Sequence, residues 1–116
     1  MKLIIKILLS AIVVMFLAYL LPGVRVHNYL SAVIVALVIG VLNTIVKPIL
    51  IVLTLPITIL TLGFFLLVIN AFIILFAGKL VDGFGVDGFW WALIFSLLLS
   101  VLQSMLNSAL NEEIEE

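Results

Sequence analysis

The most constraining feature of this sequence is a run without any charged residue, which extends from Pro48 to Gly78. One α-helix over these 31 residues would be roughly 46 Å long at about 1.5 Å per residue. The apolar core of a bilayer is only about 30 Å thick. The run is therefore too long for one membrane span and too short for two. Pro48 and Pro56 divide it, because proline lacks a backbone N–H and clashes with the preceding helical turn.

Composition places the chain among membrane proteins. Apolar residues make up 67% of the chain and charged residues 9%, whereas about a quarter of an average soluble domain is charged. The mean hydropathy is +1.58. The 116 residues leave room for about four spans of about 20 residues with short loops. We therefore expect a single all-α membrane domain.

The amino-terminal segment carries Lys2 and Lys6 and then stays apolar as far as Leu21. A signal peptide has the same order of a basic and an apolar region. No small-x-small cleavage site precedes Pro22, and the segment can span a bilayer if Lys6 reaches back to the interface. We favour an uncleaved span over a signal peptide.

The two halves of the sequence align when position 10 is placed over position 70. Between positions 10–47 and 70–107, ten of 38 pairs are identical without a gap, against roughly three or four expected by chance. This alignment also places loop 22–28 over loop 82–88. Composition alone could produce two similar apolar hairpins. We favour a duplicated two-helix hairpin, whose copies are related by a pseudo-two-fold axis along the membrane normal.

This repeat predicts four transmembrane helices in two tandem hairpins, joined by a hydrophobic elbow that prolines interrupt. Lys47, Pro48, Pro56 and Gly63 mark the elbow. We expect a short helix from Pro48 to Leu55, since proline suits the first turn of a helix. The alternative is a second span that kinks at Pro48 and continues to Leu55. The predicted parts are repeat 1 at about 3–47, the elbow at 48–62, repeat 2 at about 63–107 and an acidic tail at 108–116, with spans at about 3–21, 29–46, 63–81 and 88–107.

Lysine and arginine are distributed unequally over the two sides that these spans define. Lys2, Lys6 and Lys47 fall on one side, and Arg25 and Lys79 fall on the other. Cytoplasmic loops carry the excess of basic residues, so both termini and the elbow are predicted to be cytoplasmic. We expect Lys47 to extend toward lipid headgroups.

Small residues recur at every fourth position on the second and fourth predicted spans. This spacing keeps them on one helix face, and small faces let helices approach closely in lipid. We expect the two faces to pack against each other, and the alternative is a hydroxyl-lined pore in an oligomer. The stripes include Ala36, Gly40 and Thr44 on the second span and Ser96, Ser100 and Ser104 on the fourth.

Three side-chain amides lie within the predicted spans, at Asn43, Asn70 and Gln103. Hydrogen bonds between transmembrane helices contribute about 1 kcal/mol each. We expect such bonds to be the role of these amides.

The loops between the paired spans hold two matched segments, Val24–Val26 and Phe84–Val86. Each follows a glycine and alternates apolar with non-apolar positions, which favours extended backbone. A two-fold axis would bring the segments together in opposite directions. We therefore predict a two-stranded antiparallel ribbon with Val26 and Val86 turned toward the membrane.

The sequence offers no set of residues for catalysis, metal binding or cofactor binding. His27 is the single histidine and there is no cysteine, so neither a histidine-dependent nucleophile nor a thiolate site can be assembled. Asp82 and Asp87 provide fewer oxygen ligands than calcium needs. There is no basic patch for nucleic acid. We expect a protein that is not an enzyme.

The elbow and its flanks resemble a known family. The motifs that carry the resemblance are NTIVKPIL at 43–50, LTLPIT at 53–58, LTLGF at 60–64 and VINA at 68–71, with the loop motifs LPGV at 21–24 and GFGVDGFW at 83–90. They resemble the mycobacterial phage holin superfamily IV, also called the YvlD-like family, over nearly the whole chain. The resemblance implies a bacterial cytoplasmic-membrane protein with four spans.

Two functions fit these expectations. The first is a structural or envelope-associated membrane protein that self-assembles and has neither catalytic activity nor a cofactor. The second is a holin-like pore formed by oligomers. The expected partners are the lipid bilayer and further copies or other membrane proteins, without nucleic acid. We favour the first function.

Overall fold

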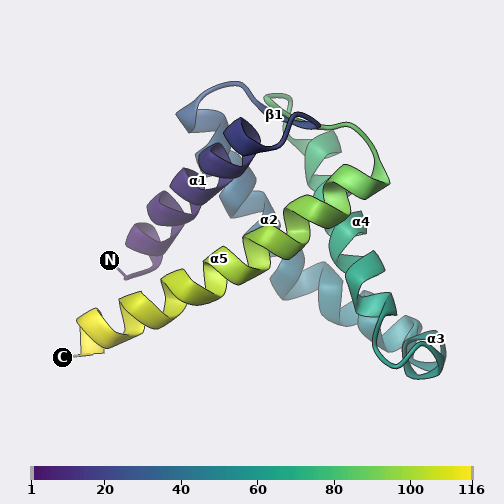
Figure 1. Cartoon of the computed structure of the whole chain (residues 1–116). Helices are drawn as coiled ribbons and strands as arrows, with labels where there is room; N and C mark the ends of the chain where they lie inside the picture. Colours follow the sequence, from purple (N-terminus) through teal and green to yellow (C-terminus); the bar gives the residue numbers. More distant parts are fainter. Residues whose placement is uncertain (1, 116) are drawn as a thin grey trace.

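The computed structural model describes the backbone of residues 2–115 and the side chains of residues 2–110. This part of the chain is almost entirely helical, with two short strands between the helices (Figure 1). The elements in chain order are α1 (Lys2–Leu20), β1 (Val24–Val26), α2 (Tyr29–Leu53), α3 (Leu55–Leu60), α4 (Phe65–Leu80), β2 (Phe84–Val86) and α5 (Phe89–Glu115).

The four long helices form a closed ring of contacts. α1 packs against α2 and α5, and α4 also packs against α2 and α5. Within the described residues, no Cα atom of α2 lies within 8 Å of one in α5. The helices meet beneath the two strands and diverge away from them, so that the carboxyl end of α5 and the α3 segment lie at opposite ends of the molecule (Figure 1).

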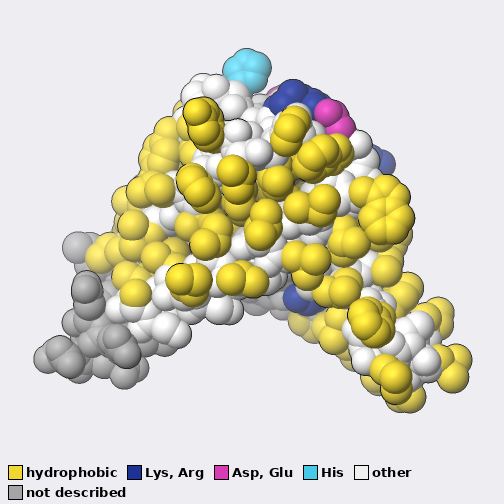
Figure 2. All heavy atoms as spheres, in the orientation of Figure 1, with side chains coloured by type: hydrophobic (Ala, Val, Ile, Leu, Met, Phe, Trp, Pro, Cys, Tyr) yellow, Lys and Arg dark blue, Asp and Glu magenta, His cyan; other side chains and the backbone are white. Residues whose placement is uncertain are grey.

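Three helical segments have the length and apolarity to cross a membrane: Lys2–Leu20, Tyr29–Leu53 and Phe89–Leu110. α4 is also apolar but has 16 residues, about 24 Å of helix. It is shorter than the predicted span at 63–81, because the chain is still turning at its start. Hydrophobic side chains cover much of the outer surface (Figure 2), as expected where lipid replaces water.

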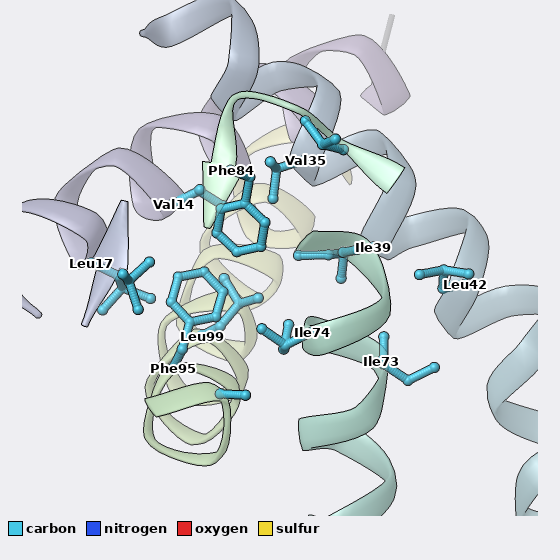
Figure 3. Packing of buried hydrophobic residues seen from close by; sticks show 14 of the residues in the cluster. Val14, Leu17, Val35, Ile39, Leu42, Ile73, Ile74, Phe84, Phe95 and Leu99 are labelled. Atoms are coloured by element: carbon cyan, nitrogen blue, oxygen red, sulfur yellow. The ribbon is translucent and has the colours of Figure 1, made fainter. Parts of the chain in front are cut away.

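The hydrophobic core lies directly beneath the strands, where the four helices converge. Phe84 reaches down from β2 onto Phe95 of α5 (Figure 3), and the two ring centroids are 5.7 Å apart. Val14, Val35 and Phe95 are completely buried. These side chains fill the centre of the ring and separate α2 from α5.

Buried positions of this core recur at equivalent places in the two halves of the chain. A tandem duplication accounts for such a pattern, because equivalent positions in the two copies face the same centre. The duplication itself stays a prediction. The buried pairs include Ala11 with Ala71, Val14 with Ile74, Val24 with Phe84, Ala32 with Ala92, and Val35 with Phe95.

The predicted ribbon is confirmed, because β1 and β2 pair in antiparallel orientation. Just outside the paired residues, the His27 N–H donates to the Gly83 carbonyl and the Asp87 N–H donates to the Gly23 carbonyl, both at 2.8 Å. These bonds extend the ribbon by one residue pair at each end. The register aligns Val24 with Val86, Arg25 with Gly85, and Val26 with Phe84.

The ribbon turns its apolar side toward the helices. Val24 and Phe84 are almost fully buried, and Val26 and Val86 are partly buried against the core. A side chain in a strand shares a face with the residue two positions away. Val26 and Val86 therefore point toward the bundle, as the sequence predicted.

The elbow differs from the preferred prediction. α2 passes through Pro48 and ends at Leu53, so a helix that starts at Pro48 is wrong. The second span continues beyond Pro48, as the alternative proposed, but ends two residues before Leu55, and the kink at Pro48 stays a prediction. Proline removes one backbone hydrogen bond, whereas ending the helix would leave several unpaired groups in apolar surroundings. The chain breaks at Thr54, and Pro56 lies in the first turn of α3.

A tight turn separates α3 from α4. Leu62 and Gly63 both adopt positive φ, at 57° and 90°, and this left-handed backbone ends α3. The hydroxyl of Thr54 donates to the Leu50 carbonyl at 2.7 Å and that of Thr61 to the Ile57 carbonyl at 3.0 Å. Each hydroxyl thus shares a carbonyl that already accepts the backbone N–H of the same threonine, at 3.0 Å in both cases, so the hydroxyl hydrogens are paired next to the breaks.

The end of α5 also differs from the prediction. The helix continues to Glu115, beyond the expected end of the fourth span at Asn107. The predicted acidic tail therefore does not begin as a separate segment at 108. The glutamate side chains of that tail lie outside the described residues.

Candidate functional site

The two stripes of small residues run from the core to the surface. They are buried beneath the ribbon and become exposed toward the other end of the molecule, since the helices diverge in that direction (Figure 1). Ala32, Ala92 and Ser96 are buried, Ala36 is partly buried, and Gly40, Thr44, Ser100 and Ser104 are exposed.

Direct packing of one stripe on the other is therefore wrong for the single chain. The exposed halves form two walls of an open groove of about 660 Å³, which α1 lines with Ser10 and Val14. We call it the polar groove. A Cβ added at Gly40 would meet no atom within 4 Å. The role of the stripes as a packing face or a pore face stays a prediction.

Gln103 and Ser10 form the polar centre of this groove. The Gln103 Nε2 donates to the Ser10 Oγ at 2.6 Å and thereby joins α5 to α1. The Gln103 Oε1 is buried and has no hydrogen-bond partner within the part of the chain that the structure describes. A buried acceptor without a partner destabilises its surroundings by about 1–3 kcal/mol. The Gln103–Ser10 contact therefore carries an unpaired acceptor within the wall of the groove.

The remaining polar residues within the helices fall into two groups. Asn43 and Lys6 line the polar groove together with Asn107. Asn70 is partly buried on α4 and does not line it. Ser96, which was predicted on the same face as Ser100, is 4% exposed and also lies outside the groove.

Two hydroxyls of the stripes are bonded within their own helices. Thr44 donates to the Gly40 carbonyl at 2.8 Å, and Ser96 donates to the Leu93 carbonyl at 2.9 Å. Such bonds use the single hydroxyl hydrogen and leave the oxygen as an acceptor. The four elbow residues do not line the polar groove: Lys47, Pro48, Pro56 and Gly63.

The ribbon holds a separate polar cluster at the other end of the helices. Arg25 of β1 forms an ion pair with Asp87, which follows β2. Figure 2 shows side chains of both charges side by side at this end of the molecule. Within the described residues, no group of three or more histidines and acids is placed to hold a metal ion. We therefore take the polar groove as the candidate functional site.

Sequence reasoning did not single out Ser10. The available signal was its position, because Ser10 lies opposite Asn70 when the two halves of the sequence are aligned. A polar residue at the same place in both halves indicates a matched interhelical contact. Ser10 makes this contact with Gln103 on α5.

Comparison with known proteins places this architecture in a family. The family model described as mycobacterial 4 TMS phage holin, superfamily IV matches residues 1–105. The uncharacterized membrane protein YvlD of Bacillus subtilis is 34% identical over 98 residues, which cover 80% of this chain and 82% of that protein. The uncharacterized protein SCO3922 of Streptomyces coelicolor is 51% identical over 72 residues, which cover 59% of this chain and 58% of that protein. No solved structure matches the chain. With a match that includes α1, α2, α4, the ribbon and most of α5, this chain belongs to the mycobacterial 4 TMS phage holin superfamily IV.

Proposed function

We propose that this protein is a self-assembling, non-catalytic component of the bacterial cytoplasmic membrane, and that its copies associate through the polar groove. The observation that carries the proposal is an open groove in the apolar surface whose lining combines small residues with the polar side chains of Lys6, Asn43 and Asn107. A helix of another copy can contact both kinds of residue, whereas lipid tails can contact only the apolar surface.

The physical reason lies in what each neighbour can supply. Acyl chains offer no hydrogen bond to the polar side chains that line the groove, whereas a second helix can offer a hydroxyl or amide. Gly40, Ser100 and Ser104 are small residues among the larger side chains of the walls. At these positions a neighbouring backbone can approach closely, which strengthens van der Waals contact in lipid.

The arrangement in the membrane follows from the placement of basic residues. Lys2, Lys6 and Lys47 support an orientation with both termini and the elbow in the cytoplasm. The polar groove then opens toward the cytoplasmic side and the ribbon caps the opposite side. The two hairpins are proposed to be tandem copies, which agrees with the buried core positions that recur at equivalent places in the two halves.

A holin-like pore is the second candidate function, and the polar lining of the groove favours it. Lys6, Asn43 and Asn107 line the same groove and would hold water if several copies surrounded a common axis. Membrane potential separates the two functions. A pore predicts an abrupt collapse of the potential at a threshold of expression, and a scaffold leaves the potential intact at high abundance.

The test of self-association uses a pair of matched substitutions. Gly40→Leu places a large side chain in the polar groove, starting from a position where an added Cβ would meet nothing within 4 Å. Gly78→Leu on α4 is the control, since it lies outside this groove and its Cβ would meet only the Phe84 carbonyl oxygen, at 3.9 Å.

Energy transfer between donor-labelled and acceptor-labelled copies in liposomes measures the association. Gly40→Leu is expected to weaken it about tenfold, which corresponds to about 1.4 kcal/mol of overpacking at the contact. Gly78→Leu is expected to leave it unchanged. Equal association of both variants with the parent would refute the groove as the contact between copies.

A further inference from the structure

A second groove, of about 670 Å³, lies between α2 and α4 beneath the ribbon. Arg25 and Lys79 line its ribbon end, and Phe72, Phe76 and Leu50 line its apolar body. No carboxylate is among the described residues that line it. We call it the cationic groove.

The two cations of this groove differ in the contacts they already make. Arg25 is held across the ribbon by its ion pair with Asp87. Its guanidinium covers Gly85, where an added Cβ would lie 2.7 Å from Nη2. Lys79 is exposed and makes no ion pair with any residue that the structure describes. Arg25 is thus oriented, and Lys79 supplies a positive charge that no described carboxylate neutralises.

The corresponding positions in the other half of the chain lack these cations. When the two halves are aligned, Tyr19 lies opposite Lys79 and Gly85 lies opposite Arg25. Both basic residues at the ribbon end therefore line one groove, although the repeat offers two equivalent places. Gly78 also lines this groove and leaves it open.

We propose that the cationic groove binds one anionic phospholipid of the leaflet on the ribbon side. The phosphate lies between Arg25 and Lys79, and an acyl chain follows Phe72 and Phe76 toward Leu50. Guanidinium groups recognise phosphate oxygens through paired donors, and the lysine ammonium attracts them as a point charge. Basic pockets between transmembrane helices bind lipid headgroups in this way.

The apolar body of the groove distinguishes a lipid from a free anion. Phe72 is 51% exposed and Phe76 is 45% exposed, so both rings are available to an acyl chain. Inorganic phosphate would contact the cations and gain nothing from these rings. The proposal does not depend on self-association, because the polar groove is formed by other helix faces.

Native mass spectrometry of the purified protein in detergent, with added phosphatidylglycerol or phosphatidylcholine, tests the proposal. We expect preferential retention of one phosphatidylglycerol. Lys79→Gln should lower this affinity about fivefold, the effect of removing one basic residue near a phosphate. Lys47→Gln is the control, because it removes an equal charge outside the cationic groove. Because Lys47 is itself expected to reach lipid headgroups, Lys47→Gln should lower phosphatidylglycerol retention, but much less than Lys79→Gln does.

A second variant tests the apolar body while both cations remain. Gly78→Leu should lower phosphatidylglycerol affinity by obstructing the groove, and leucine favours the helix more than glycine does. Gly40→Leu should retain the lipid, so that loss of association and loss of lipid binding are read separately.

Three outcomes would overturn the lipid site. The first is equal retention of phosphatidylglycerol and phosphatidylcholine. The second is an equal effect of Lys79→Gln and Lys47→Gln. The third is displacement of the lipid by millimolar inorganic phosphate, which would indicate a simple anion site. If Gly78→Leu does not fold, as judged by circular dichroism, the comparison of the two lysine variants still decides.

Discussion

The substitution Gly23→Ala tests the close contact between the ribbon and α5. The backbone of Gly23 lies against the indole of Trp91, and an added Cβ would be 2.2 Å from the nearest ring atoms, including Cγ. Carbon atoms in favourable contact are about 3.5–4.0 Å apart. The ring must therefore move by more than about 1 Å. Cγ is attached directly to the Trp91 Cβ, so a rotation of the outer ring cannot relieve the clash.

The cost follows from the kind of adjustment required. Gly23 is also held in the ribbon by the hydrogen bond from the Asp87 N–H to its carbonyl, at 2.8 Å. Either this bond lengthens or Trp91 leaves its position against the core. Overpacking of a well-filled site costs about 1–3 kcal/mol, and we expect about 2 kcal/mol of lost unfolding free energy for Gly23→Ala.

Reversible unfolding in mixed micelles of a mild detergent and dodecyl sulfate measures this loss. Two other glycines provide controls. Gly83→Ala should cost less than Gly23→Ala but more than Gly40→Ala. Its Cβ would lie 2.2 Å from the Ser31 hydroxyl, which a rotamer change can move, and 2.8 Å from the Ser31 Cβ, which it cannot move. Gly40→Ala should be neutral or stabilising by up to about 1 kcal/mol, since it adds helix propensity in open space.

The order of the three variants is the decisive result. A Gly23→Ala protein within about 0.5 kcal/mol of the parent, the range of ordinary surface substitutions, would refute the close contact. The double variant Gly23→Ala with Trp91→Ala provides a further check. If the indole is the obstacle, the double variant should lose less stability than the sum of the two single variants, because alanine has no Cγ to meet the added methyl.

Three further predictions concern hydrogen bonds and topology. Ser10→Ala should cost about 1 kcal/mol in the same unfolding assay, whereas Gln103→Leu should cost less, because it also removes the unpartnered Oε1; equal losses would contradict this. The amides of His27 and Asp87 should exchange hydrogen slowly, since both donate across the ribbon; exchange at loop rates in both would argue against the ribbon. In intact cells, His27→Cys should react with a membrane-impermeant thiol reagent and Lys2→Cys should not, and the reverse pattern would invert the orientation.

Much of the architecture was accessible from the sequence because its signals are local or repetitive. The ribbon was predicted from two short segments at equivalent places in the two halves, Val24–Val26 and Phe84–Val86, and it pairs as expected. The repeat made this possible by suggesting which loops meet. Without it, two such short segments, separated by about half of the chain, would not have been matched.

The elbow was predicted less well because a local rule was applied without its surroundings. Proline at position 48 is compatible both with the start of a helix and with a helix interior in an apolar environment. α2 continues through it and the chain breaks at Thr54. A helix end leaves backbone groups without a partner in the helix. The cost of that end decides between the two, and it depends on whether water can reach those groups.

In this protein the sequence determines which residues share a helix face, and the tertiary structure decides what covers that face. Composition and periodicity by themselves determined that the chain is a helical membrane protein, and that α2 and α5 each carry a stripe of small residues. Only the tertiary structure decided that these stripes line an open groove. Val35 and Phe95 are fully buried beneath the ribbon, and below this core the helices diverge (Figure 1). Periodicity identifies a face of a helix, but what covers that face depends on how all four helices pack.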